Sequence, residues 1–296
     1  MELTYTQPCT LCPRACGARR DRGERGFCGA GTTARIARAG LHFGEEPPIS
    51  GKRGSGTIFF CGCTLRCPFC QNHRISRDPD LGRAVDDADL AGLMLELQGM
   101  GAHNINLVTA THFLPTVTAA LDRVRADLRI PVVYNCGGYE TVETVRALAD
   151  YVDVWLPDLK YGTPEAALRC SAPADYPARA LAAITAMAEL AGQPQFDGEG
   201  MITRGVIVRH LVLPGGRRDS EAALAALAEQ VDPAMILLSL MRQYTPPAAI
   251  TLPPPLNRRL TSFEYSTALD AAAPFTGYMQ AADSADESFV PVWDLV

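Results

Sequence analysis

Six short apolar segments rich in β-forming residues alternate with helical patterns along most of this 296-residue chain. The apolar segments are residues 57–61, 104–108, 131–135, 152–157, 205–213 and 235–240. The segments with helical spacing and helix start signals are residues 86–97, 115–128, 140–149, 176–190, 219–229 and 261–273. Strands that alternate with helices form βαβ units, so the pattern predicts an α/β fold with a parallel sheet. Six repeats are too few for a closed eight-stranded barrel, and the pattern alone allows an open barrel or a doubly wound sheet.

The composition indicates a globular protein with one large core. With 47% hydrophobic and 20% charged residues, the chain can bury such a core and carry a small appendage. No stretch approaches the roughly 18 consecutive apolar residues of a membrane span, and the polar start is no secretory signal. We therefore expect a cytoplasmic protein, in which ten cysteines favour metal ligation over disulfides. The net charge of -6 gives no general attraction to nucleic acid.

Three cysteines lie on the loop that follows the first predicted strand. Cys63, Cys67 and Cys70 are spaced Cys-x3-Cys-x2-Cys. Three thiolates can hold three irons of a cubane cluster and leave the fourth iron open for chemistry. The alternative is a structural zinc site, which usually needs four ligands in two pairs. The spacing therefore favours an iron-sulfur site at the C-terminal end of a strand, where α/β barrels place their active sites.

This loop, with Phe69 before its last cysteine, resembles the signature of the radical S-adenosylmethionine (SAM) superfamily. The resemblance implies a [4Fe-4S] cluster whose open iron binds SAM, with Phe69 beside the cofactor. It implies reductive cleavage of SAM to a 5′-deoxyadenosyl radical that abstracts a hydrogen atom. It also implies an open (β/α)6 partial barrel, which we place at residues 49–296 with its C-terminal helix, after a Cys-rich N-terminal extension at residues 1–48.

Polar side chains follow the C-terminal ends of the predicted strands, so one rim should collect them. The cofactor-binding candidates there are Thr109, Thr111, His112, Asn135 and Gln243. Asp158 and Lys160 follow the fourth strand and are the catalytic candidates together with Arg209 in the fifth. Arg209 and His210 are adjacent and must point to opposite faces of that strand, and we expect Arg209 to face the interior.

Two of these motifs resemble the glycyl-radical-enzyme activating branch, of which pyruvate formate-lyase activating enzyme is typical. They are Asp158-Leu159-Lys160 and the run from Arg209 to Gly215. This resemblance implies that Asp158 belongs to a cation site near the SAM carboxylate, that Lys160 and Arg209 contact SAM, and that the substrate is a partner protein. The run from Thr109 to His112 replaces that branch's Gly-Gly-Glu-like motif, so the resemblance does not identify the residue that binds the SAM amino group. Gln243 stands where that branch carries histidine, which favours considering other substrates.

Lysine usage supports a role for Lys160. The chain has 27 basic residues, yet Lys52 and Lys160 are its only lysines. A lysine kept in an arginine-rich chain indicates a need for a compact ammonium group rather than a planar fork. Lys52 is interpreted as a surface residue.

A second cysteine group precedes the barrel. Cys9, Cys12, Cys16 and Cys28 are close enough in sequence to close around one metal site on their own. Three clustered cysteines and one distant partner favour a second [4Fe-4S] cluster, with zinc as the alternative. Seven arginines surround them, and we interpret these as a solvated positive face or as a docking patch for an acidic electron donor such as flavodoxin or ferredoxin. They are Arg14, Arg19, Arg20, Arg22, Arg25, Arg35 and Arg38.

The segment 42–51 joins the two cysteine regions, and its prolines predict an extended linker with Glu45 and Glu46 in solvent. Its alternative role is to lie across the mouth of the barrel. Three functions are consistent with these patterns. The first is an activating-enzyme-like radical SAM enzyme with a protein substrate, and the second is a radical SAM enzyme that modifies a small molecule or peptide. The third is a non-catalytic iron-sulfur protein for electron transfer.

Overall fold

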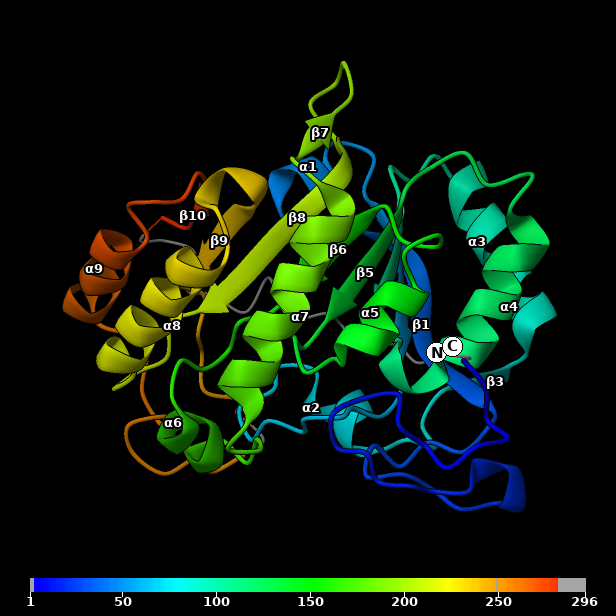
Figure 1. Ribbon diagram of the computed structural model, residues 1–296, viewed down its shortest axis with the longest axis horizontal. Coiled ribbons are helices and arrows are strands. Elements are labelled where there is room, and N and C mark those ends of the chain that lie inside the picture. The colour runs from blue at the N-terminus through cyan, green and yellow to red at the C-terminus, as the bar shows by residue number, and fades with distance from the viewer. Residues whose placement is uncertain (1–2, 249, 282–296) are drawn as a thin grey trace.

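A computed structural model describes residues 3–248 and 250–281. Its strands form one curved sheet in the order β10-β9-β8-β6-β5-β4-β2-β1-β3, with β7 paired to β8 off this path. The strands are β1 (Ala34–His42), β2 (Ser55–Phe60), β3 (Arg83–Val85), β4 (Ile105–Val108), β5 (Val132–Cys136), β6 (Val154–Pro157), β7 (Gln195–Phe196), β8 (Ile202–Leu211), β9 (Leu237–Met241) and β10 (Gly277–Met279). Figure 1 shows helices packed along the outer face of this sheet.

The parallel part of the sheet confirms the predicted α/β fold and its open, partial-barrel form. Strands β2, β4, β5, β6, β8 and β9 pair in parallel in this sequence, and each corresponds to one predicted apolar segment. Strand β10 extends the parallel sheet beyond β9, whereas β1 pairs antiparallel with β2 on the other side. The sequence patterns missed β1, because its alternation is interrupted by arginines and small residues.

Helices α3, α4, α5, α7, α8 and α9 follow the predicted segments closely, whereas the short helices α1, α2 and α6 were not predicted. They are α1 (Pro47–Ser50), α2 (His73–Arg77), α3 (Asp87–Gly99), α4 (Leu114–Val124), α5 (Val142–Ala147), α6 (Pro164–Arg169), α7 (Tyr176–Ala191), α8 (Arg217–Gln230) and α9 (Ser262–Ala271), with 3-10 turns η1 (Arg20–Arg22), η2 (Thr111–Phe113) and η3 (Pro233–Met235). Asp86 and Thr261 begin α3 and α9 with capping boxes, which satisfy amide groups that the first helical turn leaves free. No helix in the described ranges is long and apolar enough to cross a membrane.

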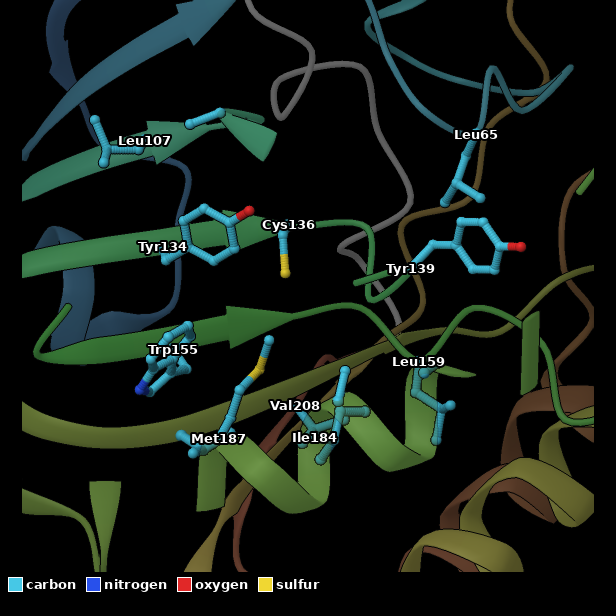
Figure 2. Packing of buried hydrophobic residues seen from close by; sticks show 14 of the residues in the cluster. Leu65, Leu107, Tyr134, Cys136, Tyr139, Trp155, Leu159, Ile184, Met187 and Val208 are labelled. Atoms are coloured by element: carbon cyan, nitrogen blue, oxygen red, sulfur yellow. The ribbon is translucent and has the colours of Figure 1, made fainter. Parts of the chain in front are cut away.

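The main core lies between the sheet and its outer helices. Strand β5 is buried along its whole length, and Tyr134 packs edge-on against Trp155 at 5.8 Å. Figure 2 shows Met187 of α7 and Val208 of β8 in the same cluster. Burying large side chains such as these typically contributes about 1.5–3 kcal/mol each, so this layer fixes the strands whose ends carry the site.

The segment before β2 fills the interior of the barrel, which corrects the predicted solvated linker. Ile49 is fully buried and packs with Val133, Leu156 and Ile207 on the inner face of the sheet. Helix α1 lies at the end of the sheet where the strands begin, away from the barrel mouth (Figure 1). The side chain of Glu45 is only 9% exposed, because its charge partner lies inside the barrel.

Candidate active site

A cavity opens at the C-terminal ends of the parallel strands, between the cysteine loop and the strand ends. Its walls include the three loop cysteines and charged or polar residues that lie in, or shortly after, five strands, namely β4, β5, β6, β8 and β9. Most of the residues predicted from sequence line it, namely Cys63, Cys67, Phe69, Cys70, Thr109, Asn135, Asp158, Lys160, Arg209 and Gln243. The fold therefore brings together residues that lie up to 180 positions apart, as Cys63 and Gln243 do.

The cysteine loop presents its sulfur atoms to this cavity and orients them by hydrogen bonds. The Leu65 amide donates to Cys63 Sγ at 3.4 Å, and the Tyr161 hydroxyl donates to Cys67 Sγ at 3.4 Å. Burial raises the pKa of the Cys70 thiol to about 12, so this thiol would lose its proton on binding a metal rather than in the free protein. Phe69 packs edge-on against Tyr244 with ring centroids 5.9 Å apart, which holds the loop against the barrel rim.

These residues fit an iron-sulfur cluster. Thiolates are the soft ligands that such clusters require, and three of them share one cavity wall. In residues 3–248 and 250–281, no three cysteine, histidine or acidic side chains are arranged to hold a single metal ion. Asn72 Oδ1 and His73 Nδ1, beside the loop, are buried without a hydrogen-bond partner within these same ranges. The loop therefore offers three thiol groups, with two polar atoms beside them that are unpaired within the described part of the chain.

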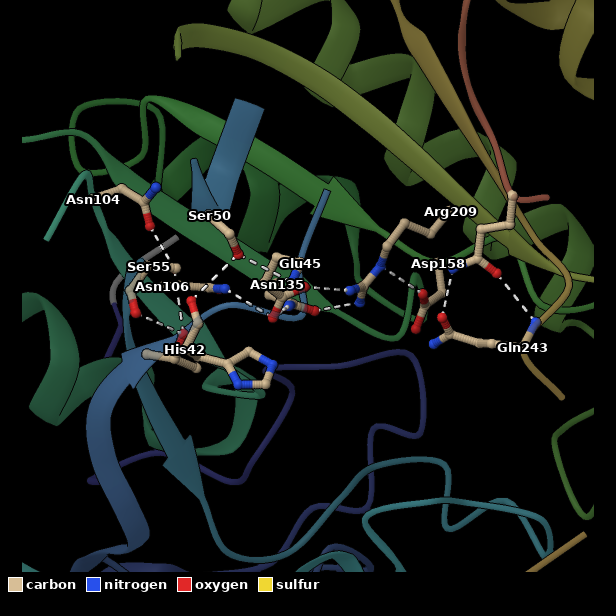
Figure 3. A network of polar contacts seen from close by, with 12 residues as sticks. His42, Glu45, Ser50, Ser55, Asn104, Asn106, Asn135, Asp158, Arg209 and Gln243 are labelled. Carbon is tan, nitrogen blue, oxygen red and sulfur yellow. Dashed lines mark hydrogen bonds and ion pairs between the residues drawn. The ribbon is translucent and has the colours of Figure 1, made fainter. Parts of the chain in front are cut away.

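A chain of buried charges crosses the barrel (Figure 3), and Asp158, Lys160 and Arg209 line the same cavity as the loop cysteines. Lys160 Nζ donates to Asp158 Oδ2 at 2.6 Å, and Arg209 Nε donates to Asp158 Oδ1 at 3.0 Å. Arg209 Nη1 donates to Glu45 Oε2 at 3.2 Å, and its Nη2 donates to Asn135 Oδ1. Asp158 thus holds two cations in place at the cavity wall, and Glu45 and Asn135 fix the far side of the guanidinium group.

Electrostatics keep Asp158 ionised in spite of its burial. Burial alone would raise the pKa of Asp158, but Arg209 and Lys160 outweigh it and hold this pKa below its usual value. Burial likewise opposes the charged form of Lys160, yet Asp158 and then Cys67 raise the pKa of Lys160 above its usual value. The cavity wall therefore carries two permanent positive charges bridged by one carboxylate.

His210 packs on the opposite face of β8, as the strand alternation predicts. Its two ring nitrogens lie 2.6 Å from the Leu159 carbonyl oxygen and 2.9 Å from Ser220 Oγ. One nitrogen therefore contacts the main chain after β6, and the other contacts α8. Arg209 is therefore the residue of this pair that reaches the cavity.

Thr111 and His112 do not line this cavity, in contrast to the prediction. The turn η2 follows β4 at once and carries both side chains away from the rim and into the protein. Thr111 Oγ1 donates to Glu140 Oε1 at 2.9 Å, and His112 Nε2 donates to the Cys61 carbonyl oxygen at 2.7 Å. Burial lowers the pKa of His112 to about 4, so this ring is neutral near pH 7. Of the three candidates after β4, only Thr109 reaches the cavity.

Sequence reasoning missed three buried acids near the site. Glu45 and Glu46 were assigned to solvent, although Glu46 is only 8% exposed, and Glu140 was not considered. Burial raises the pKa of Glu140 to about 8, and hydrogen bonds from Thr111, Tyr134 and Cys136 lower it only in part. A glutamate within a Gly-Gly-Tyr-Glu turn carries no local signal of burial, whereas the pattern around Glu45 was dominated by prolines.

The four N-terminal cysteines line a second cavity, together with Thr64 of the cysteine loop and His112. Two of the surrounding arginines, Arg14 and Arg20, also line it. Arg20 is only 4% exposed, so the predicted solvated positive face does not include it. Arg25, by contrast, forms an exposed ion pair with Asp80 at 2.6 Å.

The partial barrel, with three cysteines on the loop after its first parallel strand and a charged cavity over the strand ends, defines the radical SAM type of fold. The chain belongs to the radical SAM superfamily, whose family model matches residues 57–227. It is therefore a radical SAM enzyme, and the family implies a [4Fe-4S] cluster and SAM as its cofactors.

Two proteins show what the chain is similar to. It is 31% identical over 284 residues to the uncharacterized protein MJ0674 of Methanocaldococcus jannaschii, covering 90% of this chain and 75% of that protein. Its fold is similar to that of Streptococcus suis SuiB bound to the precursor peptide SuiA, with a TM-score of 0.50 and 12% identity. That superposition covers 75% of this chain and 47% of SuiB, so the chain spans about half the length of this structural neighbour.

Proposed function

We propose that this enzyme cleaves SAM reductively and abstracts a hydrogen atom from a residue of a polypeptide substrate. The observation that carries the proposal is the shared cavity, in which Cys63, Cys67 and Cys70 face the Asp158–Lys160–Arg209 group. This arrangement supplies metal ligands on one wall and fixed positive charge on another. An electron-transfer protein has no need for such converging charges, so the polar wall argues against the non-catalytic alternative.

Each residue has a role that follows from its contacts. Cys63, Cys67 and Cys70 would hold the cluster, which when bound and reduced supplies the electron that cleaves SAM to methionine and a 5′-deoxyadenosyl radical. Lys160 and Arg209 provide the positive charge that a methionine carboxylate requires, since charge-assisted hydrogen bonds are the stronger ones. Asp158 orients both cations, because each of its oxygens already accepts a hydrogen bond from one of them.

The remaining predicted residues supply the rest of the pocket. Phe69 gives the loop an apolar wall, and Thr109, Asn135 and Gln243 present polar atoms to the same space. We assign SAM contacts to these residues and place the enzyme in the cytoplasm, where a reduced cluster is protected. An acidic donor such as flavodoxin or ferredoxin would deliver the electron on the side of the exposed N-terminal arginines.

The proposal of a polypeptide substrate rests on two similarities to other proteins. The Asp158-Leu159-Lys160 and Arg209 motifs resemble those of the glycyl-radical-enzyme activating branch, whose substrates are proteins. SuiB was solved with a precursor peptide bound, which is compatible with the same substrate class. A small-molecule substrate is the alternative, and the experiment below must distinguish it from a polypeptide substrate.

The test uses anaerobically reconstituted protein, reduced with dithionite and incubated with SAM. We expect 5′-deoxyadenosine from the parent protein and none from Cys67→Ala. Candidate polypeptides with deuterium at glycine or other Cα positions should then transfer deuterium to 5′-deoxyadenosine. Absence of 5′-deoxyadenosine from a fully loaded protein would contradict SAM cleavage, and transfer only from labelled small molecules would contradict the polypeptide substrate.

A further inference from the structure

The second cysteine group has the features of a built metal site. Cys9, Cys12, Cys16 and Cys28 come from a stretch of twenty residues and line one cavity. Cys9, Cys12 and Cys28 are buried, and the thiol group of each could ligate a metal. No disulfide joins any of the cysteines in the described ranges.

Main-chain hydrogen bonds fold this stretch into a compact loop. The Cys9 amide donates to the Ala18 carbonyl oxygen at 3.2 Å, and the Gly17 amide donates to the Cys9 carbonyl oxygen at 3.1 Å. A Cβ on Gly26 would lie 3.2 Å from Cys16 Sγ and 3.3 Å from Cys28 Sγ, so these two sulfur atoms lie against the same glycine.

Two guanidinium groups enter this cavity without a carboxylate to balance them. Arg20 Nη2 lies 3.5 Å from Cys28 Sγ, and Arg20 Nε is buried with no hydrogen-bond partner. Arg14 Nη2 is likewise buried without a partner, while Arg14 Nε donates to the Thr64 carbonyl oxygen. Within residues 3–248 and 250–281, neither arginine forms an ion pair with an acidic side chain.

Arginine stays charged in proteins, and a buried charge without a counter-charge is costly. The groups available to supply negative charge in this cavity are the four thiols. Four thiolates around a metal core carry a net negative charge, because the core neutralises only part of their charge. A metal-bound quartet therefore balances Arg14 and Arg20, which four neutral thiols cannot do.

We propose that Cys9, Cys12, Cys16 and Cys28 bind a second, auxiliary [4Fe-4S] cluster. The quartet contains one Cys-x2-Cys pair and not the two pairs typical of structural zinc. The arrangement of three clustered cysteines and one distant cysteine suits a cubane instead.

The two sites lie against each other through one glycine. A Cβ on Gly62 would lie 2.7 Å from the Cys28 carbonyl oxygen, and Gly62 directly precedes Cys63. Thr64 of the same loop lines the quartet's cavity. The auxiliary cluster would therefore sit behind the radical SAM loop, on the side away from the SAM cavity.

The test removes the three cysteine ligands of the radical SAM cluster and measures the iron that the chain still binds. The full chain with Cys63, Cys67 and Cys70 all changed to Ala is reconstituted anaerobically, and iron, sulfide and zinc are measured together with Mössbauer and EPR spectra. We expect about four irons per chain and a [4Fe-4S] spectrum that SAM does not alter. Adding Cys12→Ala and Cys28→Ala to this variant should remove that iron.

A second variant keeps the test valid if the first fails to fold. Cys12→Ala with Cys28→Ala in the parent chain should hold about half of the parent's iron and retain an EPR signal that responds to SAM. One zinc per chain in the first variant, or the same iron content in the parent and the second variant, would overturn the auxiliary cluster. Neither readout depends on SAM cleavage, so failure here is distinct from failure of the proposed activity.

Discussion

Arg209 Nε donates to Asp158 Oδ1 at 3.0 Å, and the two residues also form a parallel β-bridge through their main chains. They are 51 positions apart, and Asp158 directly follows β6 whereas Arg209 lies in the adjoining strand β8. The register of two strands therefore sets the relative position of a cation and a carboxylate at the cavity wall. Shifting this register would separate the pair as well as misalign the sheet.

Lys160→Arg should weaken SAM binding by about ten- to a hundredfold, since losing a hydrogen bond to a charged group typically costs about 1.5–3 kcal/mol. The charge is kept, but the planar guanidinium cannot occupy the place of the ammonium 2.6 Å from Asp158. Calorimetry measures the affinity and iron analysis confirms the cluster. Lys52→Arg, at the chain's other lysine and exposed, is the control and should bind SAM normally. Unchanged affinity in Lys160→Arg would remove Lys160 from the SAM site.

Glu45→Ala should lower the free energy of unfolding by about 3 kcal/mol or more, because it leaves Arg209 buried with fewer counter-charges. Its matched control is Glu199→Ala, which removes an exposed ion pair with Arg53 at 3.0 Å and should cost less than about 1 kcal/mol. Anaerobic urea unfolding followed by circular dichroism measures both. An equal loss of unfolding free energy in the two variants would show that the charge of Glu45 contributes little to the stability of the protein.

Glu140 should make the protein less stable as the pH rises. Its pKa of about 8 in the folded chain lies above the ordinary value of 4.5, so its contribution is complete below about pH 4.5 and is lost as the pH approaches 8. Glu140→Gln should therefore flatten the fall in unfolding free energy between pH 5.5 and pH 8.5, a change on the order of a few kcal/mol. Glu143→Gln, at an exposed position of α5, should leave the fall unchanged. A parent curve that already shows no fall would contradict the raised pKa.

Gly62→Ala should destabilise the protein by about 1–3 kcal/mol and reduce the iron content of the reconstituted chain. Gly62 has φ of +87°, and a Cβ there would meet the Cys28 carbonyl oxygen at 2.7 Å, so main chain would have to move at both cysteine groups. Gly92→Ala, exposed on α3 with no atom within 4 Å of its Cβ, should instead stabilise by up to about 1 kcal/mol. Melting temperature and iron analysis on the same preparations check both outcomes.

Local patterns were enough to predict the parallel strands, most outer helices and the loop that carries Cys63. Those features depend on apolar runs and on turn residues close in sequence. Sequence proximity misplaced Thr111 and His112, because the turn η2 rotates them away from the rim that Thr109 reaches. Glu45 could not be placed, since its burial depends on Arg209, which lies 164 positions later in the chain.

The interior segment imposes an order on synthesis of the protein. Glu45 is synthesised 164 residues before Arg209, so Glu45 has no counter-ion from Arg209 until β8 has been made. A nascent chain that stops before β8 can pack Ile49 against Val133 and Leu156, but it leaves Glu45 without Arg209. The wall of the cofactor cavity is thus complete only after β8 and the residues that follow β9 have been made, because Arg209 and Gln243 both line it.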